Sequence, residues 1–250
     1  MENSFRIADY EVRKRFAQSL PADEIVFRIM SIPNQKYRVI IAIAYLTSSR
    51  ISEICCLKKE DISEIKLLNQ QAYVVQIKVS KRGDKHIKSM PILPRELEFT
   101  LLYEEIRNWM LKHRYLRQDS YLFGDPLIFE YKRKLRTKNG PVKIIPAFDN
   151  QLRKRISRYL QIHNIDINPH LFRGARLSFL VHKRKIKNPI LIQYAAGWKD
   201  ERMRAATRYI REPTAEEMAE AIMPQQKQET LAKFLKHEIK QAINAALINK

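Results

Sequence analysis

The chain has 250 residues, 45% of them hydrophobic, which is enough for one large domain with a substantial core. Its 47 lysines and arginines outnumber 27 aspartates and glutamates, which gives a formal net charge of +20 at pH 7. Such a positive field attracts polyanions and favours nucleic acid as the partner, although a ribosome-associated or membrane-surface protein has the same charge balance.

The sequence lacks the common signatures of membrane, metal and nucleotide binding. No apolar run reaches the roughly 20 residues of a membrane span, and the N-terminus has no signal-peptide pattern. There is no P-loop, GxGxxG, HExxH or Cys/His grouping, and five glycines are few for a glycine-rich phosphate loop. Cys55 and Cys56 are adjacent, as expected for reduced residues of an intracellular protein. We therefore expect a cytoplasmic protein that uses no cofactor or metal and binds phosphate through arginine and lysine.

The first half of the chain is predicted to combine helices with a small sheet. Residues 1–20 are read as a polar lead-in segment or helix that ends at Pro21. Apolar periodicity predicts helices at 22–31, 35–47 and 51–57, the second of them buried because it is apolar nearly all round. β-Branched and aromatic runs predict strands at 64–68, 72–79 and 86–93, with a glycine-centred turn at 80–85. Together the three strands form a small antiparallel sheet.

The second half is predicted to be mostly helical. A long amphipathic helix is expected at 95–114, with one apolar side formed by Leu97, Leu101, Leu102, Ile106, Trp109 and Met110. The basic stretch 132–140 has too little apolar content for a core element, so we read it as a loop or a solvated helix face that serves solubility or phosphate contact. Further helices are expected at 149–162, 170–182, 189–196 and 201–210. The fold class is therefore mainly α with a small antiparallel three-stranded β-sheet (α+β).

Two helices are expected at the C-terminal end. Thr214 precedes a helix with Glu216 and Glu217 in its first turn, which is a capping arrangement. Residues 228–249 carry an apolar stripe and follow the break Pro224-Gln225-Gln226. This last helix packs on its own domain or docks on a neighbouring subunit, and we favour exchange with the neighbour.

Chemistry-bearing residues recur along the chain in pairs and short motifs. Arg50 and Glu53 are three residues apart and share a helix face, as do His170 and Arg173. Each pair taken alone is typical of an ion pair or a surface contact. Tyr209 lies between two arginines, and its phenol, with an unperturbed pKa of roughly 10, needs cationic help to act as a nucleophile.

In chain order these residues form a series: Arg50 in Ser49-Arg50-Ile51-Ser52-Glu53, a lysine in the hairpin turn, His170-x-x-Arg173, Gly197-Trp198 and Tyr209. The series resembles the tyrosine recombinase (phage integrase) family over residues 20–222. The resemblance implies a catalytic domain of that family at 21–222, and the sequence pattern adds a lead-in segment at 1–20 and a C-terminal helix at 227–250. Because family members usually carry an N-terminal core-binding domain, we expect either a catalytic domain alone or a naturally minimal or split recombinase.

The resemblance also implies a reaction. Tyr209 would attack the scissile phosphodiester, forming a covalent 3′-phosphotyrosyl link and releasing a 5′-hydroxyl. Arg50 and Arg173 would hold the non-bridging oxygens, because a guanidinium group donates two parallel hydrogen bonds to phosphate and stabilises charge in the transition state. The bond energy is kept in the phosphotyrosine, so the family reaction uses neither metal nor nucleotide.

The remaining members of the series would assist. Lys81 would protonate the departing 5′-oxygen, and Lys85 is the alternative because both lie near the hairpin tip. His170 would help proton transfer at the nucleophile, and Trp198 would contribute packing and an indole N–H. Glu53 would orient the first arginine.

Basic side chains outside this series are expected to contact the DNA backbone: Arg82, Lys85, Lys132, Arg133, Lys134, Arg136, Arg153 and Arg155. The resemblance implies double-stranded DNA as partner and a homo-oligomer, a tetramer in the synaptic complex. Two other functions use the same features: a non-catalytic basic DNA-binding protein, and a type IB topoisomerase-like enzyme that relaxes DNA.

Overall fold

The computed structural model describes residues 20–79, 87–135, 143–165, 167–186, 188–197 and 214–223, and side chains are placed there except at 129–135, 143–149, 169, 170 and 189. The lead-in segment 1–20 (apart from its last residue), the turn 80–85 and the expected helices at 201–210 and 228–249 lie outside these residues. Among the described helices, none combines the length and the apolarity that a bilayer crossing requires.

The N-terminal helices begin at their predicted residues. Helix α2 spans Ala22–Met30, α3 spans Gln35–Leu46 and α4 spans Ile51–Ile54. The Asn34 side-chain oxygen accepts a hydrogen bond of 3.2 Å from the Tyr37 N–H and caps α3. Every residue of α3 from Val39 to Leu46 is buried, as its apolar sequence predicts. Helix α4 is shorter than predicted, because residues 55–57 lead away from it toward the 3₁₀ turn η1 at Lys59–Asp61.

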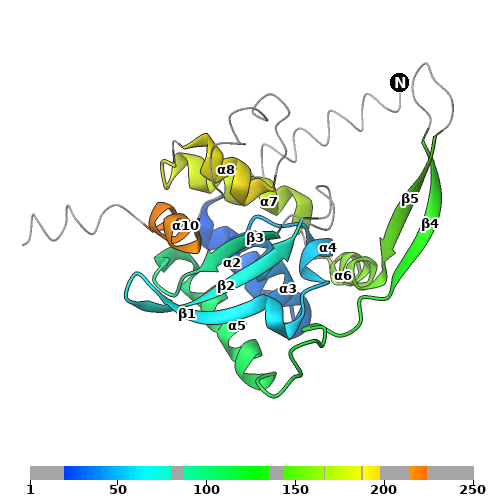
Figure 1. Cartoon of the computed structure of the whole chain (residues 1–250), viewed down its shortest axis with the longest axis horizontal. Coiled ribbons are helices and arrows are strands. Elements are labelled where there is room, and N and C mark those ends of the chain that lie inside the picture. Colours follow the sequence, from blue (N-terminus) through cyan, green and yellow to red (C-terminus); the bar gives the residue numbers. More distant parts are fainter. Residues whose placement is uncertain are drawn as a thin grey trace, which may run out of the picture.

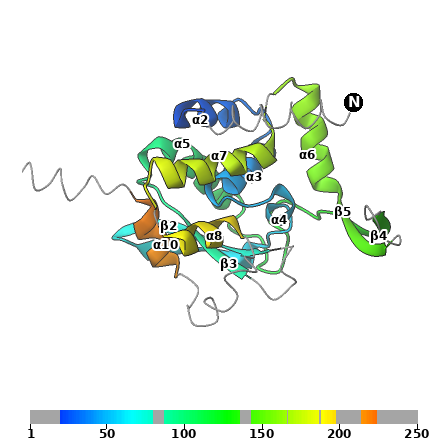
Figure 2. The same ribbon diagram turned by 90° about the horizontal axis from the view of Figure 1, so that it is seen from above.

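The three predicted strands form one antiparallel sheet in the order β1-β2-β3. Strand β1 spans Ile62–Leu67, β2 spans Gln70–Lys78 and β3 spans Ile87–Ile92. Val75 on the central strand pairs with Ile62 on one side and with Met90 on the other. Helices α2, α3, α5 and α7 lie over one face of this sheet (Figures 1 and 2). The predicted fold class is confirmed.

The helix predicted at 95–114 has a different start and a narrower buried side. A 3₁₀ turn, η2 at Leu97–Phe99, precedes α5 at Thr100–Lys112. Leu97 is 77% exposed and Leu101 is 60% exposed, so their predicted place on the buried side is wrong. The 3₁₀ turn puts Leu97 out of phase with α5, and Phe99 takes the buried position instead.

The basic stretch 132–140 is neither a loop nor a helix face over its described part. Strands β4 at Ile128–Leu135 and β5 at Lys143–Asn150 pair in antiparallel register as a two-stranded hairpin. The prediction was based on the low apolar content of this stretch. A hairpin, however, pairs its backbone N–H and C=O groups across its two strands, so it can project into solvent without a core of its own. Figures 1 and 2 show the hairpin standing away from the rest of the fold.

Four helices complete the described fold: α6 at Gln151–Ile162, α7 at Pro169–His182, α8 at Pro189–Ala196 and α10 at Ala215–Ile222. Helix α6 begins two residues later than predicted because β5 extends to Asn150. The capping box before α10 forms as predicted: Thr214 and Glu217 exchange side chain-to-backbone hydrogen bonds of 2.8 and 3.2 Å. Helix α7 packs on α3, and α8 and α10 pack beside β3.

Helix α7 is fixed to the fold by a buried ion pair. Arg176 is fully buried and donates to both carboxylate oxygens of Glu96, at 2.7 and 2.9 Å. Its guanidinium also lies over the rings of Phe99 and Phe179, 4.9 and 5.4 Å from their centroids. Since this pair is desolvated and bidentate, it sets the depth and rotation of α7, which carries Arg173 one turn earlier.

Candidate anion-binding site

A pocket of about 330 Å³ opens where α4, α6 and the start of α7 meet. Its lining residues are Ser49, Arg50, Ile51, Ser52, Arg153, Ser157, Asn168 and Arg173. Three are arginines, three carry a hydroxyl group and one carries an amide, whereas none of these eight is acidic. The lining therefore offers hydrogen-bond donors and positive charge, the combination that binds an oxyanion.

Arg50 is presented by a buried turn between α3 and α4. Thr47, Ser48 and Ser49 are almost completely shielded from solvent. Ser48 has a φ of 51°, and the Ser49 N–H donates back to the Ala44 carbonyl oxygen at 2.8 Å. The turn reverses the chain tightly after α3, so that Arg50 becomes the N-cap residue of α4 at the pocket edge.

Glu53 holds Arg50 in place. Its carboxylate accepts 2.6 Å from the Arg50 Nη1 and 2.9 Å from the Arg50 backbone N–H, as their shared helix face predicted. Burial works to raise the pKa of Glu53, but the hydrogen bonds and charge of Arg50, with the charge of Lys88, hold it below its usual value. Glu53 is therefore a carboxylate that orients the Arg50 guanidinium group.

Arg173 reaches the same pocket from α7 while remaining 6% exposed. Its Nη2 donates to the carbonyl oxygen of Ala196, the last residue of α8. Burial, followed by repulsion from the Arg50 charge, lowers the pKa of Arg173 to about 10, and Glu53 acts in the opposite direction. The two guanidinium groups are thus close enough to repel each other, and a bound anion would relieve that repulsion.

Helix α6 contributes Arg153 to the pocket. The Asn150 side chain caps α6 by accepting from the Arg153 N–H at 2.9 Å, and its amide nitrogen lies 3.5 Å from the Ser52 carbonyl oxygen. This contact joins the start of α6 to α4. Arg155, also predicted to contact DNA, is exposed on α6 but does not line the pocket.

The other predicted site residues are not brought to the pocket by the described part of the structure. Lys81, Arg82, Lys85, Arg136, Trp198 and Tyr209 lie outside the described residues. The backbone of His170 belongs to the first turn of α7, and Lys132, Arg133 and Lys134 belong to β4 on the projecting hairpin, but their side chains are not placed. Their roles stay predictions.

The turn that leads toward Trp198 is described up to Gly197. Gly197 ends α8 in the left-handed conformation, with a φ of 58°. A Cβ atom at this position would lie 3.2 Å from the Val79 Cγ1. Glycine therefore favours both the left-handed backbone conformation and the close approach of α8 to the end of β2.

Sequence reasoning missed five residues of this region. Ser49, Ser52, Ser157 and Asn168 line the pocket, and Lys88 lies buried behind it. No spacing rule singles out the serines or the asparagine. Lys88, however, alternates with the buried Met90 and Ile92 along β3, and a lysine on the inward face of a strand is a signal that could have found it.

The described residues hold no cluster of histidine, cysteine or acidic side chains suited to a metal ion. What they do form is an arginine pocket within a mainly helical domain with a three-stranded sheet. The model of the phage integrase family matches residues 18–217, so the chain belongs to this family.

Solved structures of recombinases on DNA are similar to this chain. Two are XerH recombinase bound to difH substrate: the pre-cleavage complex has 19% identity and a TM-score of 0.43, covering 72% of this chain and 45% of XerH. The post-cleavage complex on palindromic difH has 18% identity and a TM-score of 0.44, covering 86% and 51%. The third is the FLP recombinase–Holliday junction complex, with 11% identity and a TM-score of 0.46, covering 85% and 53%. The chain spans about half the length of these recombinases. No curated protein gives a match.

Proposed function

We propose that this chain is a site-specific DNA recombinase that cleaves and rejoins DNA through a covalent 3′-phosphotyrosine intermediate. The observation that carries the proposal is the convergence of Arg50 and Arg173, from distant parts of the sequence, on one pocket without an acidic lining residue. Membership of the phage integrase family supports the same conclusion.

In this proposal Arg50 and Arg173 hold the scissile phosphate. Arg50 is fixed by Glu53 and Arg173 by the end of α8, so neither guanidinium has to be ordered when DNA binds. Preorganised donors of this kind stabilise the additional negative charge that develops on the non-bridging oxygens in the transition state. Arg153, more exposed at the pocket edge, contacts the scissile phosphate or its neighbour along the strand.

Tyr209 supplies the nucleophile. Its phenolic oxygen attacks phosphorus, the bond to the 5′-oxygen breaks, and the DNA 3′-phosphate becomes linked to the tyrosine. Lys81, with Lys85 as the alternative, donates the proton that the departing 5′-oxygen takes up, and His170 assists removal of the phenol proton. Trp198 packs beside the site. Attack of a 5′-hydroxyl from another strand on the phosphotyrosine restores a phosphodiester and releases Tyr209.

The partner is double-stranded DNA, contacted by the predicted basic side chains around the pocket and on the β4–β5 hairpin. Recombination joins strands from two duplexes, so we propose that the chain acts as a homo-oligomer, a tetramer on paired sites, with the segment 227–250 docked on a neighbouring subunit. Native mass spectrometry of the protein on its selected DNA tests the tetramer: a strictly monomeric complex would contradict it.

The decisive experiment traps the covalent intermediate. The protein is incubated with a library of randomised duplexes, each nicked near its centre so that the short strand leaves after cleavage. Covalent adducts are isolated on a denaturing gel and their DNA is sequenced. We expect an adduct with wild type and with Tyr115→Phe, a matched change at a tyrosine that is 85% exposed. The adduct is lost in Tyr209→Phe.

Three outcomes separate the candidate functions. An adduct that persists in Tyr209→Phe contradicts the assignment of the nucleophile. Relaxation of supercoiled plasmid, without junction or recombinant products on paired selected sites, supports the topoisomerase-like alternative. Salt-sensitive binding without any adduct supports a non-catalytic DNA-binding protein.

A further inference from the structure

Lys88 is a buried cation that the proposed chemistry does not use. It lies on β3 with 1% of its surface exposed. Its Nζ donates to the carbonyl oxygen of Thr47 at 2.9 Å and to that of Ala195 at 2.6 Å. Within the part of the chain that the structure describes, Lys88 forms no salt bridge. Burying a lysine without a carboxylate partner is costly, so a purely apolar side chain would serve the core better at this position.

Both carbonyl groups that Lys88 binds belong to helix ends. Thr47 is the C-cap residue of α3, and Ala195 is the penultimate residue of α8. Carbonyl groups in the last turn of a helix lack intrahelical donors and carry the negative end of the helix dipole. Two helix ends therefore face one ammonium group, which explains how the charge is tolerated there.

These two contacts connect both halves of the arginine pocket. The Thr47 carbonyl lies three residues before Arg50, in the buried turn that presents it. The Ala195 carbonyl lies next to the Ala196 carbonyl, which accepts from Arg173. The last two carbonyl groups of α8 thus bind two cations in succession, Lys88 and Arg173. Without the Lys88 ammonium group, the turn that carries Arg50 would lose its link to the end of α8, where the Ala196 carbonyl oxygen binds Arg173.

We propose that Lys88 is a positioning residue of the arginine pocket, tying the turn that carries Arg50 to the end of α8 that holds Arg173. The inference rests on the proposed function only in naming phosphate as the natural ligand. Lys88 does not line the pocket, so it acts on the bound anion through the two arginines and not by contact.

The charge of Lys88 is sensitive to what the pocket holds. Burial, the largest cause, lowers the pKa of Lys88 to about 7; Glu53 raises it, and Arg173 and Arg50 lower it further. The other elements packed around Lys88 present neutral groups to it. The C-cap of α3 and the end of α8 present backbone carbonyl groups, and α8 also carries the Tyr194 hydroxyl group, which accepts a hydrogen bond from the Ser89 N–H. Strand β2 places Ile77 opposite Lys88. An anion between the arginines favours the protonated lysine, and by linkage the protonated lysine favours the anion.

The test uses inorganic sulfate, which does not titrate in the range used, and reads the side-chain Nε–H NMR signals of Arg50 and Arg173 in the intact protein. In wild type we expect both signals to move together on sulfate addition, with an affinity roughly tenfold weaker at pH 9 than at pH 6, within the usual range of coupling between sites. In Lys88→Met the affinity is weak at both pH values and the two signals no longer move together.

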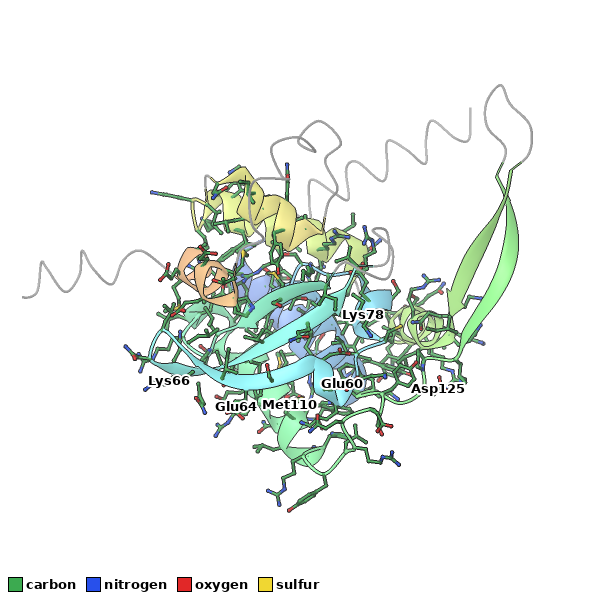
Figure 3. All side chains as sticks on the ribbon, viewed as in Figure 1. Glu60, Glu64, Lys66, Lys78, Met110 and Asp125 are labelled. Carbon is green, nitrogen blue, oxygen red and sulfur yellow. The ribbon has the colours of Figure 1, made fainter. Side chains whose placement is uncertain are left out.

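The matched control is Lys66→Met, at an exposed lysine on β1. Figure 3 shows Lys66 at the end of the sheet opposite Lys78, which lies near α4. This variant keeps the wild-type affinity and its pH dependence. Should Lys88→Met fail to fold, the wild-type protein suffices: the Lys88 Cε signal must titrate near neutral pH, and its midpoint must rise when sulfate is added.

The proposal would be overturned if a folded Lys88→Met protein kept the wild-type sulfate affinity and its pH dependence. It would also be overturned if sulfate left the titration midpoint of the Lys88 Cε signal unchanged. The covalent-adduct assay is independent of these readings. If sulfate behaves as expected and no adduct forms, Lys88 positions an anion site that is not a recombinase centre. If adducts form at the wild-type rate in Lys88→Met but not in Tyr209→Phe, the recombinase proposal stands and the inference on Lys88 fails.

Discussion

Replacing Glu53 with glutamine isolates the contribution of one charge to the arginine pocket. The Glu53 side chain is 2% exposed and accepts two hydrogen bonds from Arg50, at 2.6 and 2.9 Å. It is also the carboxylate whose charge acts on Arg173 and Lys88. Glutamine has the same shape, but its amide turns one acceptor into a donor that faces an Arg50 N–H. The variant therefore loses a charge-assisted bond to Arg50 and the negative charge that acts on Arg173 and Lys88.

The magnitude follows from these contacts. A hydrogen bond to a charged group contributes about 1.5–3 kcal/mol, and removing one partner of a buried ion pair costs about 3–5 kcal/mol. The Arg50 side chain is 19% exposed, so water recovers part of the loss, and glutamine keeps one acceptor. We expect Glu53→Gln to lower the free energy of unfolding by about 2–3 kcal/mol, which moves the urea midpoint by about 1 M. Glu64→Gln, at an exposed residue of β1, is the control and leaves the midpoint unchanged.

The difference in the free energy of unfolding between wild type and Glu53→Gln must also decrease as the pH falls. The pKa of Glu53 in the folded protein lies below its ordinary value of 4.5. Its stabilisation is therefore fully present above pH 4.5 and is lost as the pH falls through the folded pKa. Urea unfolding from pH 7 down to the acid limit of the folded state should show the two proteins converging. A midpoint equal to that of wild type at pH 7, or a gap that stays constant toward acid, would refute the role given to Glu53.

Three further changes have expected outcomes. Glu96→Ala leaves the Arg176 guanidinium buried and unpaired, so it should lower the free energy of unfolding by about 3–5 kcal/mol in urea titrations; a loss under about 1 kcal/mol contradicts the buried pair. Gly197→Ala combines a left-handed backbone with a contact of 3.2 Å to Val79, and should cost about 1–2 kcal/mol and slow adduct formation. Arg153→Ala should weaken DNA binding and reduce the salt slope of log K by about 1, measured by fluorescence anisotropy over a salt series; an unchanged slope excludes a phosphate contact.

Much of the described fold could be predicted because local signals and tertiary packing agree. Helix α8 has the predicted bounds: Pro189 suits its first position and Gly197 ends it. Helix α3 is apolar all round and lies at the centre of the core. The β4–β5 hairpin was missed because its pairing, and not its apolar content, makes it a regular element. Leu97 was misplaced because a 3₁₀ turn changed the helical phase, which periodicity alone does not reveal.

The site could be predicted only in part. The spacing of Arg50 and Glu53 placed them on one face, and the structure gives their salt bridge. The resemblance to the recombinase family put Arg50 and Arg173 in one series, but residue spacing by itself carries no information on their distance in space. That proximity depends on the buried turn after α3 and on the depth of α7, both of which are tertiary properties.

The way the pocket cations are held has a consequence for phosphate binding. A carboxylate partner for each cation would fix it well, but would also cancel the charge that attracts phosphate. Here one carboxylate, Glu53, pairs with Arg50, whereas Arg173 and Lys88 are held by the terminal carbonyls of α8. Helix-end carbonyls carry only partial negative charge, so they orient the cations without neutralising them. The cluster of Arg50, Arg173 and Lys88 against Glu53 therefore keeps a net positive charge when Lys88 is protonated. Under the proposed function, a phosphate group between the two guanidinium groups would supply the missing negative charge, so its binding and the protonation of Lys88 would reinforce each other.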